Sequence, residues 1–158
     1  YGWEQNMQHV GEVLACSTFE ATEKWVDEHV DLFTEGQTPD PYQFSKQCVT
    51  AYVKSKTRAP EFIDRKIRIN AIGPSFTSTA LIKEFNLAAS SDGTEAGGAQ
   101  VLHDLYLKSW NGRPGLPEEM GYPLVFIGSD LFSYLSGQVL YIDFGLTGEF
   151  DFQAASAK

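Results

Sequence analysis

The N-terminal part of the chain places apolar side chains at helical intervals. Met7, Val10 and Val13 recur every three residues, so residues 4–15 are expected to form a helix with one apolar face. A second helix is expected over residues 19–30, where apolar residues again return after three or four positions.

The junction between these two helices has a capping pattern. Ser17 is followed three residues later by Glu20, which is the spacing of a capping box, so we expect Ser17 to cap the second helix. A loop is expected over residues 36–41. A long helix is expected over residues 42–58, which contain neither Gly nor Pro, and Ala59-Pro60 should break it.

Two later segments have the character of strands. Residues 66–72 alternate Ile67, Ile69 and Ala71 with polar residues, which predicts a strand that ends at Gly73-Pro74. A second strand is expected over residues 138–143.

The chain between the two strands reads as loop and helix. A flexible stretch is expected at residues 90–98. A helix is expected over residues 117–128, because Pro117 stands in its first turn and Glu118 and Glu119 lie near the positive end of its dipole. Two short strands joined by a long helical crossover are typical of a parallel α/β fold. A parallel pair alone is marginally stable, so the sequence predicts part of a larger sheet.

Composition narrows the class of function. The net charge of −9 and the pI of about 4.7 argue against nucleic acid or an anionic membrane surface as a partner. No apolar run approaches the roughly 20 residues that a membrane span requires. We therefore expect a soluble, cytoplasmic protein.

The cysteines and histidines lack the spacings of known chemical motifs. Cys16 and Cys48 are too few for a disulfide scaffold and are expected to be buried or half-buried thiols. His9, His29 and His103 lie far apart in the sequence, so no metal site is expected.

One tyrosine and one lysine have a spacing that suits acid–base chemistry. Tyr42 and Lys46 are four residues apart on the expected long helix and therefore share a face. A lysine ammonium near a tyrosine hydroxyl favours the phenolate form, which can exchange a proton with a carbonyl or alcohol oxygen. The spacing alone is weak, because Tyr52 and Lys56 repeat it one helical segment later and an ordinary surface pair fits it equally.

Four segments carry longer patterns, in a fixed order. They are Tyr42–Lys46, Ile67–Thr79, Gly112–Glu119 and Ser129–Asp143. They resemble, respectively, Y-x-x-x-K, R-[VI]-N-x-[IV]-x-P-G-x-x-x-T, G-R-x-x-x-P-E-E and S-D-x-x-S-Y-[IV]-x-G-Q-x-[LI]-x-[VI]-D-G-G. This set resembles the short-chain dehydrogenase/reductase family over residues 42–146.

The resemblance implies a fold class. It implies the C-terminal part of a doubly wound Rossmann-type α/β fold, with two parallel strands among helices and the N-terminal half absent. Residues 1–158 would then be one partial domain: a helical insertion and loop over residues 1–41, the motif-bearing segment over residues 42–146, and a tail over residues 147–158. The insertion resembles that of the subset containing 3α-hydroxysteroid dehydrogenase/carbonyl reductase.

The resemblance also implies an activity and a site. The reaction would be hydride transfer between NAD or NADP and a small hydrophobic carbonyl compound or secondary alcohol. Tyr42 would be the catalytic acid/base, and Lys46 would assist it and bind the nicotinamide ribose. The segment beside the nicotinamide would contain Pro74, Ser75, Phe76, Thr77 and Thr79.

This sequence departs from the family pattern in several places. The glycine-rich T-G-x-x-x-G-x-G turn that holds the pyrophosphate does not occur. Ser75 replaces the Gly after Pro74, and Phe144 replaces the first Gly of D-G-G. Ser17 has a loose match to the strand that carries the family's catalytic serine, but the helical period around it favours the helix cap.

Three hypotheses remain at this point. The chain is an oxidoreductase sequence that is inactive on its own because its cofactor site is incomplete. Alternatively, it is a non-catalytic fragment that self-associates as a homodimer or higher oligomer through an open sheet edge. The third hypothesis, a small α/β binding module, requires the four patterns to be accidental.

Overall fold

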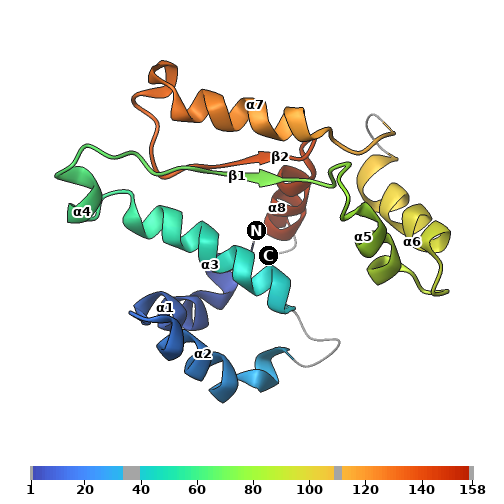
Figure 1. The fold of residues 1–158 in the computed structure, drawn as a ribbon, viewed down its shortest axis with the longest axis horizontal. Coiled ribbons are helices and arrows are strands. Elements are labelled where there is room, and N and C mark those ends of the chain that lie inside the picture. Colours follow the sequence, from blue (N-terminus) through green and yellow to red (C-terminus); the bar gives the residue numbers. More distant parts are fainter. Residues whose placement is uncertain (1, 34–39, 109–111, 157–158) are drawn as a thin grey trace. The chain divides into compact units, whose positions relative to one another are not determined.

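The computed structural model describes residues 2–33, 40–108 and 112–156 (Figure 1). The chain divides into two compact units, each of which is described by itself. Unit 1 contains residues 1–70 and 135–138, and unit 2 contains residues 71–134 and 139–158. Within the described ranges, no helix is long and apolar enough to cross a membrane.

Unit 1 is helical. The 3₁₀ turn η1 (Trp3–Asn6) leads into α1 (Met7–Ala15), which is followed by α2 (Phe19–Glu28) and the 3₁₀ turn η2 (Val30–Phe33). The long helix α3 (Pro41–Lys56) and the short α4 (Pro60–Ile63) complete its helices. The first two α-helices are confirmed as predicted from periodicity, and α3 as predicted from its lack of Gly and Pro. The loop expected at residues 36–41 falls mostly outside the described residues, and its last residue, Pro41, belongs to α3.

The core of unit 1 joins these helices through their apolar faces. Val10 of α1, Trp25 of α2, and Phe44 and Ala51 of α3 form a buried cluster. Phe44 and Ala51 are seven residues apart, or about two helical turns, so they lie on one face of α3. The indole of Trp25 stacks on the Phe44 ring with centroids 5.8 Å apart. This packing fixes which face of α3 remains exposed.

The cap of α2 differs from the expectation. Thr18, rather than Ser17, is the N-cap, and its hydroxyl accepts a hydrogen bond from the Ala21 backbone N–H at 3.2 Å. Thr18 has the extended backbone that an N-cap requires, with φ −136° and ψ 162°, and the helix begins one residue later than the capping-box spacing suggested. The residues before Ser17 belong to α1, so Ser17 does not follow a strand.

Unit 2 contains a two-stranded parallel sheet. Strand β1 (Ala71–Pro74) pairs with β2 (Val139–Ile142) in the register Ala71↔Val139 to Pro74↔Ile142. The parallel arrangement and the second strand are as predicted. The long helix α7 (Pro117–Gly128) begins and ends as expected, contains Pro123, and packs along β1 (Figure 1).

The first strand was predicted too early in the chain. Residues 66–70 are not part of the sheet, and Gly73 and Pro74 belong to the strand instead of ending it. The backbone of Ile69 bonds to the turn at Ser136 and Gly137: its carbonyl accepts from the Gly137 N–H at 2.7 Å. Its N–H donates to the Ser136 hydroxyl at 3.2 Å. The alternation of apolar and polar residues does not show whether the backbone bonds to a turn, as here, or to a neighbouring strand.

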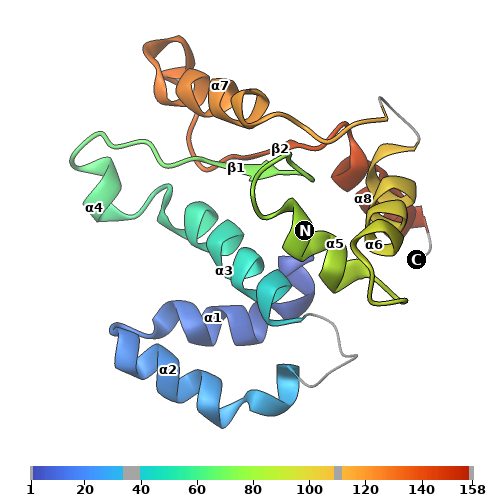
Figure 2. The same ribbon diagram turned by 45° about the vertical axis from the view of Figure 1, so that its right-hand side comes forward.

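A pair of short helices follows β1. Helices α5 (Ile82–Ala89) and α6 (Glu95–Leu102) lie side by side (Figure 2), and α6 continues into a π-helical turn over His103–Leu107. The flexible stretch expected at residues 90–98 therefore contains the first turn of α6. Gly98 lies so close to α5 that a Cβ at this position would overlap the carbonyl oxygen of Asn86.

The C-terminal segment is also helical. After the 3₁₀ turn η4 (Asp130–Phe132) and β2, helix α8 runs over Leu146–Ser156, where a tail was expected. The Asp143 carboxylate accepts hydrogen bonds from the backbone N–H groups of Gly145 and Thr147 at 2.9 and 2.8 Å. This carboxylate therefore fixes the turn from β2 into α8.

Candidate functional site: the Tyr42–Lys46 face and the end of the sheet

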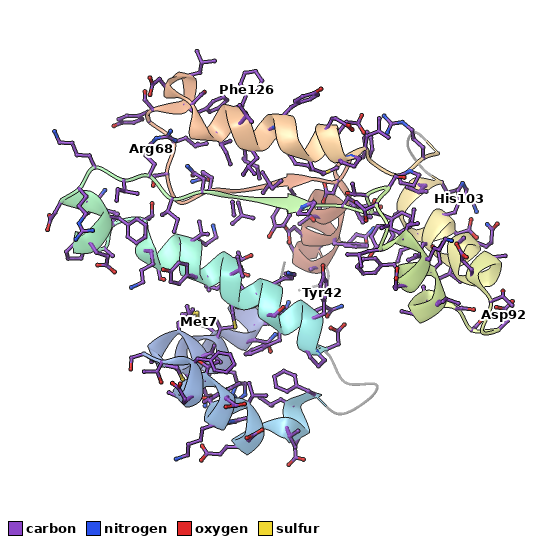
Figure 3. All side chains as sticks on the ribbon, in the orientation of Figure 1. Met7, Tyr42, Arg68, Asp92, His103 and Phe126 are labelled. Carbon is purple, nitrogen blue, oxygen red and sulfur yellow. The ribbon has the colours of Figure 1, made fainter. Side chains whose placement is uncertain are left out.

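Helix α3 presents Tyr42 and Lys46 on its exposed side. Asp40 starts the helix, since its carboxylate accepts a hydrogen bond from the Gln43 N–H at 2.9 Å, and Pro41 occupies the first turn. Tyr42 lies near this N-terminal end (Figure 3) and is 59% exposed. Because Phe44 and Ala51 bury the opposite face, the Tyr42 side chain lies on the solvent side of α3.

The lysine lies against the tyrosine ring. The Nζ atom of Lys46 is 5.0 Å from the ring centroid of Tyr42, within the range of a cation–π contact. Within the described part of the chain, Lys46 forms no ion pair. Its ammonium therefore remains available to stabilise a phenolate or to bind a ligand hydroxyl.

The second tyrosine–lysine pair of α3 is chemically different. Lys56 Nζ lies 5.9 Å from the Tyr52 ring centroid, but it also forms a 2.8 Å ion pair with Glu61 of α4. The carboxylate raises the pKa of Lys56, mainly through this hydrogen bond, and compensates its charge. The two pairs have the same sequence spacing, but the ammonium of Lys56 is paired with the Glu61 carboxylate.

The segment expected beside the nicotinamide continues from β1 in unit 2. The Ser75 N–H donates to the Ile142 carbonyl at 3.2 Å, and the Phe76 carbonyl accepts from the Gly115 N–H at 2.9 Å. The Thr77 hydroxyl donates to the Ser75 carbonyl at 2.7 Å, and the Thr79 carbonyl accepts from the Ile82 N–H at 3.1 Å. These bonds order the predicted segment at the carboxyl end of the sheet.

A cavity of about 380 Å³ opens at the same end of unit 2. It is lined by Gly115, Glu119, Met120 and residues 141–145. In open α/β sheets, ligands bind outside the carboxyl ends of the strands, which is the location of this cavity. Phe144 on its wall has φ 54°, a left-handed conformation in the position where the family pattern has Gly.

The G-R-x-x-x-P-E-E pattern corresponds to a local clamp at the start of α7. The Arg113 guanidinium donates to both Glu119 carboxylate oxygens, at 2.8 and 2.7 Å, and Glu119 also accepts from the Leu116 backbone N–H at 2.8 Å. The Arg113 hydrogen bonds, followed by the Leu116 bond, lower the pKa of Glu119 to about 2. The clamp holds a wall of the cavity.

The remaining family patterns meet in unit 1. The Asn70 side chain donates to the Leu135 carbonyl at 3.0 Å and accepts from the Gln138 N–H at 3.1 Å. Arg68 also donates to the Leu135 carbonyl, at 3.2 Å. Asn70 and Arg68 therefore tie together two segments more than 60 residues apart in the chain.

The structure thus forms two parts of the expected site. It brings Tyr42 and Lys46 together in unit 1 and orders residues 74–79 in unit 2. Sequence reasoning missed the cavity-lining residues Met120, Tyr141 and Asp143. The signal that was available for Asp143 was its place directly after the second strand, where ligand-facing residues of α/β folds occur.

Comparison with known proteins gives the family. A family model described as enoyl-(acyl carrier protein) reductase, which represents short-chain dehydrogenases/reductases, matches residues 7–147. The chain belongs to the short-chain dehydrogenase/reductase family.

Individual relatives match parts of this chain. A 3-oxoacyl-(acyl-carrier-protein) reductase of Thermotoga maritima is 36% identical over 92 residues, which are 58% of this chain and 32% of that protein. Glucose 1-dehydrogenase of Gluconobacter oxydans is 31% identical over 112 residues, which are 71% of this chain and 38% of that protein. The chain thus spans about a third of the length of these relatives.

A solved structure shows the same fold. The 3-alpha-hydroxysteroid dehydrogenase from Pseudomonas sp. B-0831, complexed with NADH, matches with a TM-score of 0.63 and 22% identity. The match covers 94% of this chain and 51% of that one. The two strands and their helices are therefore part of a Rossmann-type α/β fold.

Proposed function

We propose that this chain carries the acid–base part of an NAD(P)-dependent oxidoreductase that interconverts carbonyl compounds and secondary alcohols. The observation that carries the proposal is the exposed Tyr42 with the Lys46 ammonium 5.0 Å from its ring centroid and no competing ion pair on Lys46 among the described residues. Membership of the short-chain dehydrogenase/reductase family supports this chemistry.

Resemblance to the family assigns Lys46 and residues 74–79 to the binding of the nicotinamide part of the cofactor. Lys46 is free to bind ribose hydroxyls, and the backbone of residues 74–79 offers polar groups at the end of the sheet. The glycine-rich phosphate turn does not occur in the sequence. When bound, the nicotinamide would supply or accept the hydride.

Tyr42 and Lys46 divide the proton chemistry between them. In carbonyl reduction, the Tyr42 hydroxyl donates its proton to the substrate oxygen as that oxygen gains negative charge. The resulting phenolate is stabilised by the Lys46 ammonium. Alcohol oxidation reverses both steps.

The substrate class is a hydrophobic ketone or secondary alcohol. The relatives include enzymes named for 3-oxoacyl groups and for 3-hydroxysteroids, and both compounds carry a carbonyl or secondary alcohol on an apolar body. The apolar lining of the cavity, with Met120, Tyr141 and Phe144, is consistent with such a body.

The test is turnover by a fusion in which the N-terminal part of the Thermotoga maritima relative precedes residue 1 of this chain. With NAD(P)H and a panel of hydrophobic ketones, we expect carbonyl reduction. Tyr42→Phe should lower kcat by about 10²–10⁴-fold and leave cofactor affinity nearly unchanged, since only proton transfer is lost. Lys46→Ala should impair both kcat and cofactor affinity.

Tyr52→Phe is the matched control, because Tyr52 occupies the same helix and has the same lysine spacing. It should retain nearly full turnover. A fusion that binds NAD(P)H but reduces none of the ketones would contradict the proposed function. An inactive Tyr52→Phe beside an active Tyr42→Phe would contradict the site assignment.

A further inference from the structure

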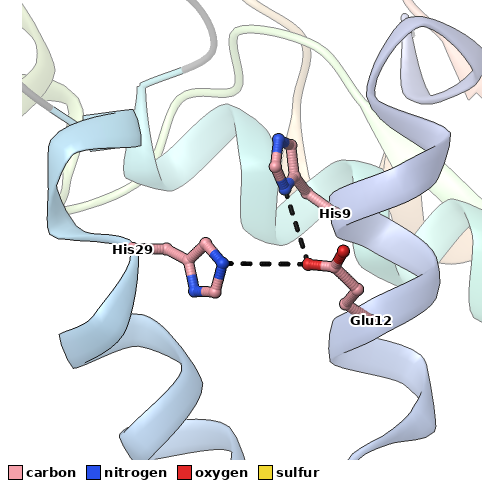
Figure 4. Close-up of side chains that lie close together, drawn as sticks. All are labelled: His9, Glu12 and His29. Carbon is pink, nitrogen blue, oxygen red and sulfur yellow. Dashed lines mark ion pairs between the residues drawn. The ribbon is translucent and has the colours of Figure 1, made fainter.

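We propose that His9, Glu12 and His29 form a binding site for a divalent zinc-class metal ion in unit 1. His9 and Glu12 lie one turn apart on α1, and His29 is the C-cap residue of α2 (Figure 4). One potential ligand atom from each residue lies within 4.8 Å of the other two. The proposal is independent of the oxidoreductase activity.

The distances suit a small coordination sphere. The Nδ1 atom of His9 is 3.6 Å from Glu12 Oε2, and the Nε2 atom of His29 is 3.9 Å from the same oxygen. Bond lengths of roughly 2.1 Å in a tetrahedral zinc site place neighbouring ligand atoms about 3.4 Å apart. The two distances to Glu12 are within a few tenths of an ångström of this value. The two histidine nitrogens lie within 4.8 Å of each other and would approach by as much as about 1.4 Å when an ion binds.

The tautomer of neutral His29 is set by the backbone carbonyl of Trp25. Its Nδ1 atom lies 2.8 Å from the Trp25 backbone carbonyl, which can only accept a hydrogen bond. Nδ1 therefore carries the hydrogen in the neutral imidazole, which leaves the lone pair of Nε2 on the side of Glu12. This is the arrangement in which metal-binding histidines are typically held, with the second nitrogen donating to a carbonyl or carboxylate.

His9 supplies an unusual polar atom. Its Nδ1 is buried and has no hydrogen-bond partner in the described part of the chain, although it faces the Glu12 carboxylate. Leaving a buried polar nitrogen unpaired costs free energy, and a bound cation would remove that cost.

The carboxylate is oriented by two donors. Trp25 Nε1 donates to Glu12 Oε2 at 3.0 Å, and Gln8 Nε2 donates to Oε1 at 3.2 Å. These two bonds hold the carboxylate in one orientation between the two histidines. Trp25 is itself 8% exposed and stacks on His29 with centroids 4.2 Å apart, so one buried side chain positions two of the three ligands.

The donor set selects the kind of metal. Two imidazoles and one carboxylate suit Zn²⁺ and similar transition metals, whereas Mg²⁺ prefers oxygen ligands. Three protein ligands leave a fourth tetrahedral position for water. The ion would connect α1 to the C-terminal end of α2 and so stabilise this helical pair.

The experiment is calorimetric titration of the metal-free 158-residue chain with ZnCl₂ at neutral pH. We expect one equivalent to bind with micromolar or tighter affinity, and MgCl₂ to bind negligibly. His9→Gln, His29→Gln and Glu12→Gln should each weaken zinc binding at least tenfold. His103→Gln, which removes the third histidine, and the double variant Cys16→Ser/Cys48→Ser should retain it.

A second measurement avoids reliance on the folding of variants. Nitrogen-15 NMR of the unaltered chain should show zinc-dependent shifts at His9 Nδ1 and His29 Nε2, the two nitrogens assigned as ligands. Absence of these shifts, or loss of binding in the cysteine variant with retention in the histidine variants, would overturn the proposal. Absence of zinc binding to the unaltered chain would overturn it as well.

Discussion

Ionisation of the Glu119 carboxylate contributes to the pH dependence of the chain's folding stability. Its pKa is about 2 in the folded chain, because Arg113 and the Leu116 N–H bind the carboxylate, against an ordinary value of 4.5. The pKa of Asp92 is likewise lowered to about 2, first by the hydrogen bond from the Ser90 hydroxyl and then by those from Thr94. Both groups favour the folded state when they are ionised.

We therefore predict acid destabilisation that depends on Glu119. Its stabilising effect is fully present above about pH 4.5, where the unfolded chain is also ionised, and is lost as the pH falls from 4.5 towards 2. Urea unfolding at pH 6, 4 and 3 should show a steeper loss for the natural chain than for Glu119→Gln.

Glu118→Gln is the control for this prediction. It makes the same change of charge one residue away, at a side chain with no ion pair among the residues that the structure describes. It should leave the acid dependence close to that of the natural chain. Equal pH profiles for the natural chain and Glu119→Gln would show that the Arg113 clamp does not contribute to stability.

At the scale of elements, the contact of α5 with α6 depends on the missing side chain of Gly98. A Cβ here would overlap the Asn86 carbonyl oxygen, so Gly98→Ala must push the two helices apart. We expect a loss of about 1–3 kcal/mol in the free energy of unfolding, the usual cost of overpacking. Thermal or urea denaturation checks it.

Gly121→Ala in α7 is the matched control. A Cβ at Gly121 meets nothing within 4 Å, and Ala is the better helix former by up to about 1 kcal/mol. This variant should be as stable as the natural chain or more so. A destabilised Gly121→Ala together with a neutral Gly98→Ala would contradict the described packing.

The helices of unit 1 were largely predictable because α1, α2 and α3 each bury an apolar face in one core. Helix α8 buries none of its side chains and was not predicted. The start of α7 could be read from Pro117 and the acidic residues that follow it. The start of β1 could not be read from the sequence, because the hydrogen bonds of Ile69 go to Ser136 and Gly137, far along the chain. Alternation of apolar and polar side chains indicates which side of the backbone is buried, but it does not identify the segment to which the backbone forms hydrogen bonds.

The candidate site was predictable only in part. The four-residue spacing identified Tyr42 and Lys46, but their difference from Tyr52 and Lys56 depends on Glu61, which α4 brings to Lys56. The meeting of His29 with His9 depends on the packing of α2 against α1, and a sequence separation of 20 residues carried no sign of it.

At the scale of the whole molecule, the missing glycine-rich turn determines nucleotide affinity. The 158-residue chain retains Lys46 and residues 74–79 for the nicotinamide side but has no pyrophosphate turn in its sequence. We predict that NADH and NADPH bind with Kd above about 1 mM, because few contacts offset the cost of association. Calorimetry giving a micromolar Kd would contradict this and indicate another phosphate site.

Exposed apolar side chains favour self-association of the chain. On and after α7, Val125 is 72% exposed, Leu131 79% and Tyr134 105%. Exposed apolar surface of this kind commonly marks an interface. We predict oligomers at micromolar concentration in analytical ultracentrifugation and a shift to monomer for Val125→Asp/Leu131→Asp.

Phe19→Asp serves as the control, since Phe19 of α2 is 77% exposed and stands in unit 1. It should leave the sedimentation profile unchanged. A natural chain that sediments as a monomer would contradict the prediction.

The short segment Leu135–Gln138 decides how the helical half can be prepared by itself. A polypeptide that stops at Asn70 contains the zinc-site residues and the Tyr42–Lys46 pair, yet it removes the partners of Thr57, Ile69 and Asn70. Cleavage after Asn70 alone therefore yields a fragment whose C-terminal residues have lost hydrogen-bond partners. A minimal peptide for spectroscopy should therefore join residues 135–138 to Asn70 through a short linker. Such a peptide keeps residues that lie together in unit 1 although they are far apart in the sequence.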